Sequence, residues 1–242
     1  MIQTIYYIIL GYFLLGGVSF YFINRKKERE AARKNWTKFI SYFIIIHVLF
    51  FSIVWNPPAF RYVALVILLV GAFELIKVFS DSDYRRKGFF TFSLILFALC
   101  ALAFFNFSGL ERGLILFSFL ILSIFDSFSQ ISGQLFGKKK LLPAISPNKT
   151  VGGLVGGALV ALLSGFLLKD LYAAVPQKAV LLAASVVLFA FLGDVAASIF
   201  KRKYGVKDYS NLLPGQGGFL DRFDSLLVAG AWVAIADRLL GL

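Results

Sequence analysis

The sequence predicts an all-α, polytopic integral membrane protein with about eight transmembrane helices. Three observations predict this class: 59% of the 242 residues are hydrophobic, 28 are phenylalanine, and the mean hydropathy is +0.81. A soluble domain of this length carries much less apolar surface. Repeated apolar segments, each near the roughly 20 residues that a helical crossing needs, alternate with short polar joints. We therefore expect residues 1–242 to form a single membrane domain.

Each apolar segment is predicted as a helix, because lipid offers no partner for an unpaired backbone amide or carbonyl. In chain order, the predicted helix cores are 2–23, 39–55, 60–79, 89–107, 114–129, 151–168, 179–200 and 219–240. The first core has no charged residue before it and no small-residue cleavage site, so we expect a retained helix rather than a signal peptide. A re-entrant segment near residue 130 would change the helix count.

Lys and Arg predict the orientation of these helices. Of the 25 basic residues, 18 lie in four alternate joints, at 25–38, 85–87, 138–149 and 201–207. By the positive-inside rule, these joints are cytoplasmic and both termini face the opposite side of a cytoplasmic (inner) membrane. Topology thus explains most of the basic residues behind the +12 net charge, and we expect no nucleic-acid binding.

Isolated polar residues inside the predicted helices have simple structural interpretations. Cys100 has no second cysteine for a disulfide or a thiolate metal site. His47 stands alone in an apolar stretch and is expected to be a hydrogen-bonded structural histidine rather than a proton relay. Glu74 and Lys77 are three residues apart on one helix, and we expect them to form an ion pair.

Two of the basic joints carry further chemistry. Residues 125–153, "FDSFSQISGQLFGKKKLLPAISPNKTVGG", and residues 193–225, "GDVAASIFKRKYGVKDYSNLLPGQGGFLDRFDS", combine acids, glycines and lysines on one membrane face. Four aspartates lie at or near the helix ends beside these joints, namely Asp126, Asp194, Asp221 and Asp224. A charge within the membrane costs on the order of 3 kcal/mol. A cluster of such charges therefore indicates a functional site.

The spacing of these residues predicts how they meet. Asp194, Ser198 and Lys201 occur at i, i+4 and i+7, which places them on one face of a helix. Asp221 and Asp224 are three apart at the start of the last helix and also share a face. The preceding loop contains the small or turn-forming residues Pro214, Gly215, Gly217 and Gly218, whose backbone amides can approach an oxyanion at a helix N-terminus.

This combination of residue types favours a phosphate and metal site. Carboxylate oxygens hold Mg²⁺, and a metal together with Lys and Arg neutralises phosphate oxygens. Taken singly, an aspartate at a helix start is an ordinary cap, and glycines such as those of "GGLVGG" serve close helix packing. Their occurrence together on one face is the observation that favours the site.

These residues resemble a known family. The pattern is similar to the C-terminal signature of the phosphatidate cytidylyltransferases, also called CDP-diacylglycerol synthases, and its spacing matches over some 27 positions. The matching residues are Ser198, Lys201, Arg202, Lys207, Asp208, Ser210, Leu213, Pro214, Gly217, Gly218, Asp221, Arg222 and Asp224. Upstream, "FGKKKLLPAISPNKTVGG" resembles a second stretch of the same family, with Asp126 at the position of its preceding acid. The resemblance covers about the C-terminal half.

Two positions depart from the family pattern. Gln216 stands where the family usually has His, and Gly152 stands where it usually has Glu. Gln donates a hydrogen bond but carries no proton at neutral pH. The missing Glu removes a metal ligand or a lysine partner. Both changes bear on the rate, the number of metal ions and the acceptor more than on the class of reaction.

The resemblance implies a nucleotidyltransferase that transfers CMP from CTP to phosphatidate, giving CDP-diacylglycerol and pyrophosphate for phospholipid biosynthesis. It makes 111–242 the candidate catalytic half and 1–110 a less informative set of helices. The implied partners are CTP, phosphatidate or a related lipid, membrane lipids and Mg²⁺, and a second cation and a homodimer are compatible with them. The active site is expected at the cytoplasmic face.

The resemblance also implies roles for individual residues. The expected metal ligands are Asp126, Asp194, Asp221 and Asp224. The expected catalytic residues, which neutralise or orient phosphate groups, are Ser198, Lys201, Arg202, Lys207, Asp208 and Arg222. The expected substrate-binding residues are Ser146, Asn148, Lys149, Thr150, Pro214, Gly215, Gln216, Gly217 and Gly218.

Other functions stay open at this point. A CTP-dependent lipid-alcohol kinase or a CDP-archaeol-type synthase keeps the nucleotide chemistry with a different acceptor. A catalytically inactive membrane homologue matches the changes at positions 216 and 152. A transporter is a poorer match, since transporters place charges near the bilayer middle in paired repeats, whereas these charges collect on one face.

Overall fold

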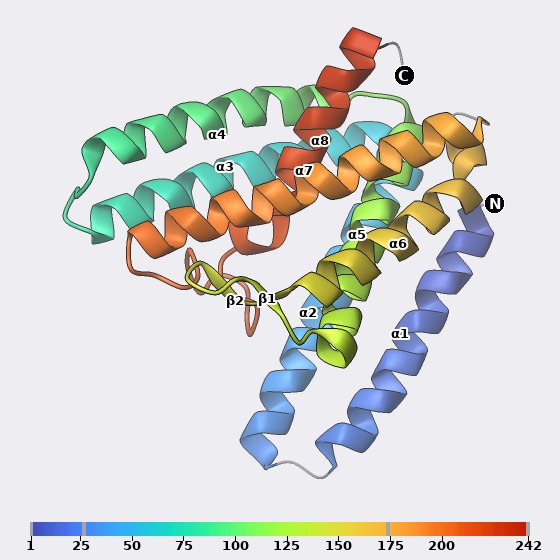
Figure 1. The fold of residues 1–242 in the computed structure, drawn as a ribbon, viewed down its shortest axis with the longest axis horizontal. Coiled ribbons are helices and arrows are strands. Elements are labelled where there is room, and N and C mark those ends of the chain that lie inside the picture. Colours follow the sequence, from blue (N-terminus) through green and yellow to red (C-terminus); the bar gives the residue numbers. More distant parts are fainter. Residues whose placement is uncertain (1, 26–27, 173–174, 241–242) are drawn as a thin grey trace.

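The computed structural model describes residues 2–25, 28–172 and 175–240, and within them the chain forms eight α-helices and a small β-hairpin (Figure 1). The helices are α1 (Ile2–Asn24), α2 (Arg29–Val54), α3 (Pro57–Asp81), α4 (Lys87–Phe107), α5 (Arg112–Phe136), α6 (Val151–Leu167), α7 (Pro176–Lys203) and α8 (Leu220–Leu240). A short 3₁₀ helix, Lys169–Leu171, follows α6. Each predicted helix core overlaps one observed helix, so the predicted order of elements is confirmed.

Two local features differ from the sequence-based expectation. Helix α5 continues unbroken to Phe136, so the chain does not turn back near residue 130, where the sequence left a re-entrant segment open. The segment before α6 forms an antiparallel hairpin of β1 (Lys140–Leu142) and β2 (Ser146–Thr150). Lys140 pairs with Thr150 in this hairpin. The all-α prediction omitted these two strands because a three-residue strand has no hydrophobic periodicity to reveal it.

The helices have the lengths and surfaces of a polytopic membrane protein. Five of the described helices, α2, α3, α4, α5 and α7, are long and apolar enough to cross a membrane, and the described parts of α1 and α6 are shorter apolar helices. Large apolar side chains stay exposed on the outside, among them Leu69, Leu99 and Leu181. In water such a surface would be unfavourable, whereas in a bilayer lipid chains cover it.

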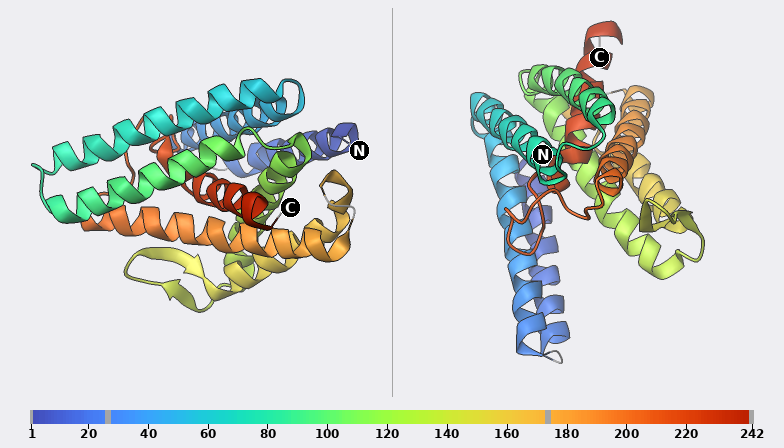
Figure 2. Two further views of the ribbon diagram at one scale, coloured as in Figure 1. Left: turned by 90° about the horizontal axis from the view of Figure 1, so that it is seen from above. Right: turned by 90° about the vertical axis from the view of Figure 1, so that its left-hand side faces the viewer.

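Helix α8 occupies the centre of the C-terminal bundle, although charges interrupt its apolar sequence. It packs against α7, α4, α5 and α3, and most of its residues from Phe223 to Ala236 are buried (Figure 2). Gly193 of α7 allows the closest approach: a Cβ at this position would lie 2.8 Å from the carbonyl oxygen of Asp224. The neighbouring Asp194 is thereby held beside the start of α8.

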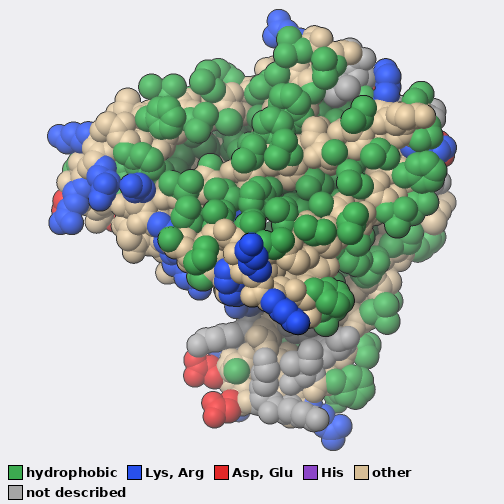
Figure 3. Space-filling model, viewed as in Figure 1, with side chains coloured by type: hydrophobic (Ala, Val, Ile, Leu, Met, Phe, Trp, Pro, Cys, Tyr) green, Lys and Arg blue, Asp and Glu red, His purple; other side chains and the backbone are tan. Residues whose placement is uncertain are grey.

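The four basic joints lie on one side of the molecule. In Figure 1, the α1–α2, α3–α4, α5–α6 and α7–α8 connections occupy the left and lower side, and the other three connections and both termini lie toward the right and top. Figure 3, in the same view, shows apolar side chains across the middle of the molecule, with Lys and Arg mainly along the left and lower edges and some at the top and upper right. Residues 26 and 27 of the first basic joint lie outside the described residues.

The isolated polar residues mostly behave as structural groups. Nδ1 of His47 lies 2.8 Å from the carbonyl oxygen of Phe43, and the ring packs among aromatic side chains of α1 and α2. Cys100 is a free thiol on α4. Both observations agree with packing roles.

Candidate functional site

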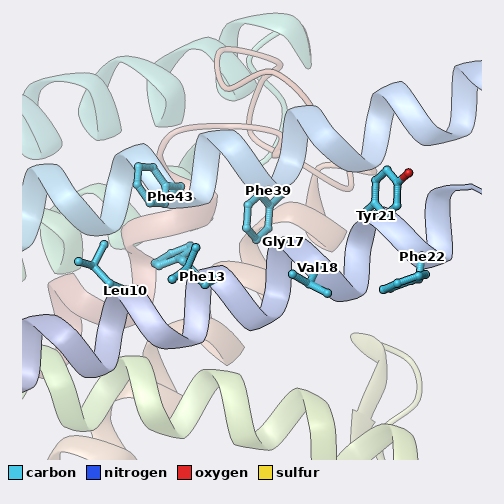
Figure 4. A pocket seen from close by; sticks show the side chains of 9 residues that line it. Leu10, Phe13, Gly17, Val18, Tyr21, Phe22, Phe39 and Phe43 are labelled. Carbon is cyan, nitrogen blue, oxygen red and sulfur yellow. The ribbon is translucent and has the colours of Figure 1, made fainter.

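One groove in the described part of the chain lies away from the place where the charged residues meet. It lies between α1 and α2, has a volume of about 670 Å³ and presents almost only apolar surface (Figure 4). Its lining residues are Leu10, Phe13, Leu14, Gly17, Val18, Tyr21, Phe22, Phe39 and Phe43. Such a lining suits hydrocarbon chains and offers neither a carboxylate for a metal nor a cation for a phosphate.

A charged cluster forms instead where α5, β2, α7 and α8 meet at the basic side of the molecule. We use the name charged cluster for Asp126, Lys149, Asp194, Lys201, Asp221, Arg222 and Asp224. Its first part joins β2 to α7, because Lys149 Nζ lies 2.5 Å from Asp194 Oδ2. Ser198, one turn further along α7, donates a hydrogen bond of 3.3 Å to Asp194 Oδ1. The predicted shared face of Asp194 and Ser198 is therefore confirmed.

The second part of the charged cluster is a buried ion pair between α7 and α8. Lys201 Nζ lies 2.5 Å from Asp221 Oδ1, and the two side chains are only 11% and 3% exposed. The other oxygen of Asp221 accepts hydrogen bonds from the backbone amides of Tyr209 (2.8 Å) and Gly218 (2.9 Å). Asp221 therefore holds the connecting loop at Tyr209 and at Gly218, and both of its oxygens are already occupied.

Asp224 lies one turn after Asp221 on α8, within electrostatic range of Asp194 and Lys201. Its Oδ1 accepts a hydrogen bond of 2.7 Å from the amide of Ser225. Among the described residues, no hydrogen-bond donor to Oδ2 of Asp224 is found. Asp224 therefore keeps an oxygen free for a ligand.

Asp126 approaches the charged cluster from α5. Its carboxylate is within electrostatic range of Asp194, Lys149 and Arg222. Asp126 and Arg222 are both exposed, whereas Lys201 is buried. The charged cluster thus has a closed end at the Lys201–Asp221 pair and an accessible end at Asp126 and Arg222.

The carboxylates fit a metal ion that arrives with a nucleotide better than an ion held by protein alone. Within the described ranges, no three Asp, Glu, His or Cys side chains gather closely enough to form a metal site. Mg²⁺ commonly takes one or two carboxylates and completes its shell with water and substrate phosphate. Asp194 and Asp224, on adjacent helices, could hold such an ion if Asp194 released Lys149 and Ser198, to which its two oxygens are bonded here. The predicted four-carboxylate site stays a prediction.

Tyr209 is surrounded by the carboxylates of this region. Burial raises the pKa of its phenol well above the ordinary value of 10, and Asp224, Asp221 and Glu74 raise it further. Its ring centroid lies 5.1 Å from Lys201 Nζ. The phenol therefore stays protonated at physiological pH and contributes packing rather than a base.

The predicted glycine loop forms a tight turn. The amide of Gln216 donates to the carbonyl of Leu213 at 3.0 Å, and Gly215 has a φ of +72°. A turn with Pro214 second and a positive φ at the third position has the signature of type II, which favours glycine there. Because the amide of Gly218 donates to Asp221, it is not available to an oxyanion in this state.

The remaining predicted site residues serve the surrounding framework or stay exposed. Arg202 donates from Nε to the carbonyl of Ile145 (3.0 Å) and from a terminal nitrogen to that of Val206 (3.0 Å), which ties the hairpin to the end of α7. Thr150 is buried and caps α6 by accepting the amide of Gly153. Three more of the predicted site residues are exposed, and Ser146 is half-buried; the exposed ones are Asn148, Lys207 and Asp208.

Helix α2 contributes contacts that the sequence did not predict. Ser41 donates a hydrogen bond of 3.2 Å to the carbonyl of Pro214, and Gln216 Nε2 donates one of 2.8 Å to the carbonyl of Lys38. Tyr42 lies near Ser127 of α5 and within electrostatic range of Asp126 and Arg222 of the charged cluster. The α2 residues Lys38, Ser41 and Tyr42 belong to no sequence motif, so these contacts are visible only in the packing of α2.

The expected pair of Glu74 and Lys77 is wrong. Glu74 turns inward from α3 and accepts hydrogen bonds from the amides of Phe219 (2.8 Å) and Leu220 (2.6 Å) and from the hydroxyl of Ser210. Lys77 is exposed. The first amides of α8 have no partner within the helix and lie at the positive end of its dipole. They therefore bind the Glu74 carboxylate in preference to the exposed Lys77. An acid inside an apolar helix is a functional signal that the sequence did contain.

The structure gives a physical reason for one departure from the family pattern. A Cβ at Gly152 would lie 2.8 Å from the carbonyl oxygen of Phe136, so this position has no space for a glutamate. Gln216 has a role of its own in tying the loop to α2. Neither departure removes a member of the charged cluster.

The buried ion pair predicts that replacing Lys201 lowers the stability of the protein more than replacing Lys169 does. Lys201→Met should lower the free energy of unfolding by about 3–5 kcal/mol, because it leaves a buried carboxylate without its counterion. Lys201→Met combined with Asp221→Asn should recover part of this loss. Thermal unfolding in detergent micelles measures both effects.

The matched control is Lys169→Met, which removes the exposed partner of Asp170 (side chains 30% and 59% exposed) and should cost less than about 1 kcal/mol. Equal losses for the two lysine variants, or no recovery in the double variant, would contradict a buried pair.

Known proteins resemble this chain over most of its length. The model of the cytidylyltransferase family matches residues 5–240. A phosphatidate cytidylyltransferase of Staphylococcus epidermidis is 35% identical over 209 residues, covering 82% of this chain and 80% of the relative. Proteins of the same name from Rickettsia bellii and Bacillus subtilis are 29% and 38% identical, covering 85% and 67% of this chain and 94% and 61% of their own lengths. The chain belongs to the cytidylyltransferase family.

Proposed function

We propose that this chain is a phosphatidate cytidylyltransferase, which transfers CMP from CTP to phosphatidate and releases pyrophosphate. The three relatives described above are all named phosphatidate cytidylyltransferase. The observation that carries the proposal is the convergence of paired acids and bases at the basic side of a membrane bundle, where a cytosolic nucleotide and a lipid head group can both arrive. The acyl chains of the lipid remain in the bilayer.

The reaction needs little from the protein beyond charge and position. An oxygen of the phosphatidate phosphate attacks the α-phosphorus of CTP, and the bond to the bridging oxygen breaks so that pyrophosphate leaves with the electron pair. The attacking oxygen is already anionic at neutral pH, so no serine, cysteine or histidine nucleophile is required. The main barrier is the approach of two anions, which fixed positive charge lowers.

The cations of the charged cluster supply this charge. Lys149 and Arg222 lie at the accessible end, and exchange of Asp194 for a phosphate would free Lys149 to bind the nucleotide. Lys207 and Arg202 extend the positive surface beside them. Lys201 acts from the closed end, where it keeps Asp221 in place. Ser198 keeps the carboxylate of Asp194 oriented along α7.

Asp194 and Asp224 are the residues we propose for Mg²⁺, with Asp126 facing them from α5. Asp221 would join them only if its pair with Lys201 opened, and a second cation is compatible with this arrangement. When bound, Mg²⁺ withdraws charge from the phosphate oxygens and from the departing pyrophosphate. The carboxylates also repel a nucleotide that arrives without a cation, so they favour the metal-bound form of CTP.

The basic side is proposed to face the cytoplasm of an inner membrane, since the joints there contain most of the lysines and arginines. A homodimer stays a prediction. The inactive-homologue alternative is motivated by Gln216 and Gly152. Gln216 bonds to the carbonyl of Lys38 on α2 and Gly152 packs against Phe136, and neither belongs to the charged cluster, which supports an active enzyme.

Product analysis tests the proposal directly. Purified protein in detergent, incubated with labelled CTP, Mg²⁺ and phosphatidate, should form CDP-diacylglycerol and pyrophosphate in equal amounts. Formation of CDP together with a newly phosphorylated alcohol would show a kinase instead. Turnover only with an ether-linked acceptor would support the archaeol-type synthase, and no turnover with any acceptor would contradict the proposal.

The role of Asp224 predicts a large loss of activity without loss of fold. Asp224→Asn should reduce CDP-diacylglycerol formation by about 100-fold or more, because a neutral amide binds Mg²⁺ poorly and stabilises less charge in the transition state. Asp81→Asn, at an exposed acid on the same side of the molecule, is the control and should keep normal turnover. Near-normal turnover of Asp224→Asn with a normal elution profile would rule out this role.

A further inference from the structure

Glu74 is the most deeply buried charged residue described by the structure. Its exposed fraction is 0%, although it lies in the middle of the apolar helix α3. Among the described residues, Lys201 is 8% exposed and the side chain of Asp221 is 3% exposed, and these two groups form an ion pair with each other. A carboxylate in such a position is unfavourable unless hydrogen-bond donors compensate it. The location of those donors therefore indicates what Glu74 does.

The donors all belong to residues 210–220, the segment that leads into Asp221, Arg222 and Asp224 of the charged cluster. Oε1 of Glu74 accepts the hydroxyl of Ser210 and the amide of Phe219, and Oε2 accepts the amide of Leu220. The two amides are at the N-terminus of α8, where the helix dipole also favours a negative charge. Glu74 thus acts as the N-terminal cap of α8, although it lies some 146 residues earlier in the chain.

Glu74 and Asp221 hold the same loop from two sides. Glu74 binds Ser210 and the start of α8, while Asp221 binds the amides of Tyr209 and Gly218. A Cβ at Gly218 would lie 2.8 Å from Asp221 Oδ2 and 2.9 Å from Glu74 Oε1, so this residue is enclosed between the two carboxylates. Movement of Glu74 would therefore displace Asp221 and, one turn later, Asp224.

We infer that Glu74 is a positioning residue for the CMP transfer. It fixes the first turn of α8 so that Asp221 and Asp224 face α7, and it makes no contact with substrate itself. This inference rests on the proposed function for its catalytic consequence, but the contact with α8 can be tested without turnover. It also assigns a role in the reaction to the N-terminal half of the chain, which carries no signature motif.

Glu74→Gln is the discriminating variant. The amide has one acceptor oxygen and directs an NH₂ group at a site where three donors already converge, so the start of α8 loses part of its cap. Hydrogen–deuterium exchange of the full chain in detergent should show about 10-fold faster exchange in the peptide spanning 208–222, with α5 unchanged. With CTP, Mg²⁺ and phosphatidate, kcat should fall by about 10-fold or more while KM for CTP changes less than about threefold.

Two further variants keep the test decisive. Lys77→Gln, an exposed change one turn along α3, should match the wild type in exchange and in kcat. Ser210→Ala removes one donor to Glu74 and should change both readouts in the same direction by about two- to fivefold. If Glu74→Gln does not fold, Ser210→Ala still tests whether Glu74 positions α8.

The outcomes separate this inference from the proposed function. Wild-type exchange in Glu74→Gln, or faster exchange with kcat within about twofold of wild type, would overturn the positioning role. If Glu74→Gln does not fold, wild-type exchange and kcat in Ser210→Ala would overturn it equally. If the wild type makes no CDP-diacylglycerol, the proposed function fails, and the exchange data still show whether Glu74 holds α8.

Discussion

The placement of the charged cluster depends on compensating two buried carboxylates, Glu74 and Asp221, in a largely apolar environment. An isolated buried charge would cost several kcal/mol, whereas backbone amides, a hydroxyl and Lys201 offset that cost here. The compensation has a geometric consequence, because each donor must stay in place. The loop from 204 to 219 therefore takes a defined path, and α8 begins at a fixed point beside α7.

Close packing of the helices brings the acidic residues on neighbouring helices near one another. Gly193 brings the backbone of α7 against Asp224, and Gly157 of α6 packs against Phe125 and Ser129 of α5. With larger residues at these positions, the helix ends that carry Asp126, Asp194 and Asp224 would be further apart. Small residues at helix contacts are common in membrane proteins, since lipid provides no hydrophobic force between helices. Here they also set the distance between opposing acids.

The sequence predicted the parts of the structure that local chemistry determines. Hydropathy was sufficient for the eight helices, and the spacing of Asp194 and Ser198 was sufficient for their shared face. The partners of Asp221 and Glu74 were beyond prediction, because they depend on the path of a long loop and on the packing of α3 against α8. Glu74 illustrates this limit. Its nearest basic residue in sequence is Lys77, which was therefore the predicted partner, but Glu74 instead binds the first amides of α8. The short hairpin before α6 was missed for lack of periodicity.

The most direct measurement is an experimental structure of the protein with CTP and Mn²⁺, in which anomalous scattering locates the metal. We expect the metal peak on Asp194 and Asp224, with the triphosphate against Lys149 and the Lys201–Asp221 pair behind it. A metal bound away from these two aspartates, or a nucleotide outside the basic side of the bundle, would contradict this expectation.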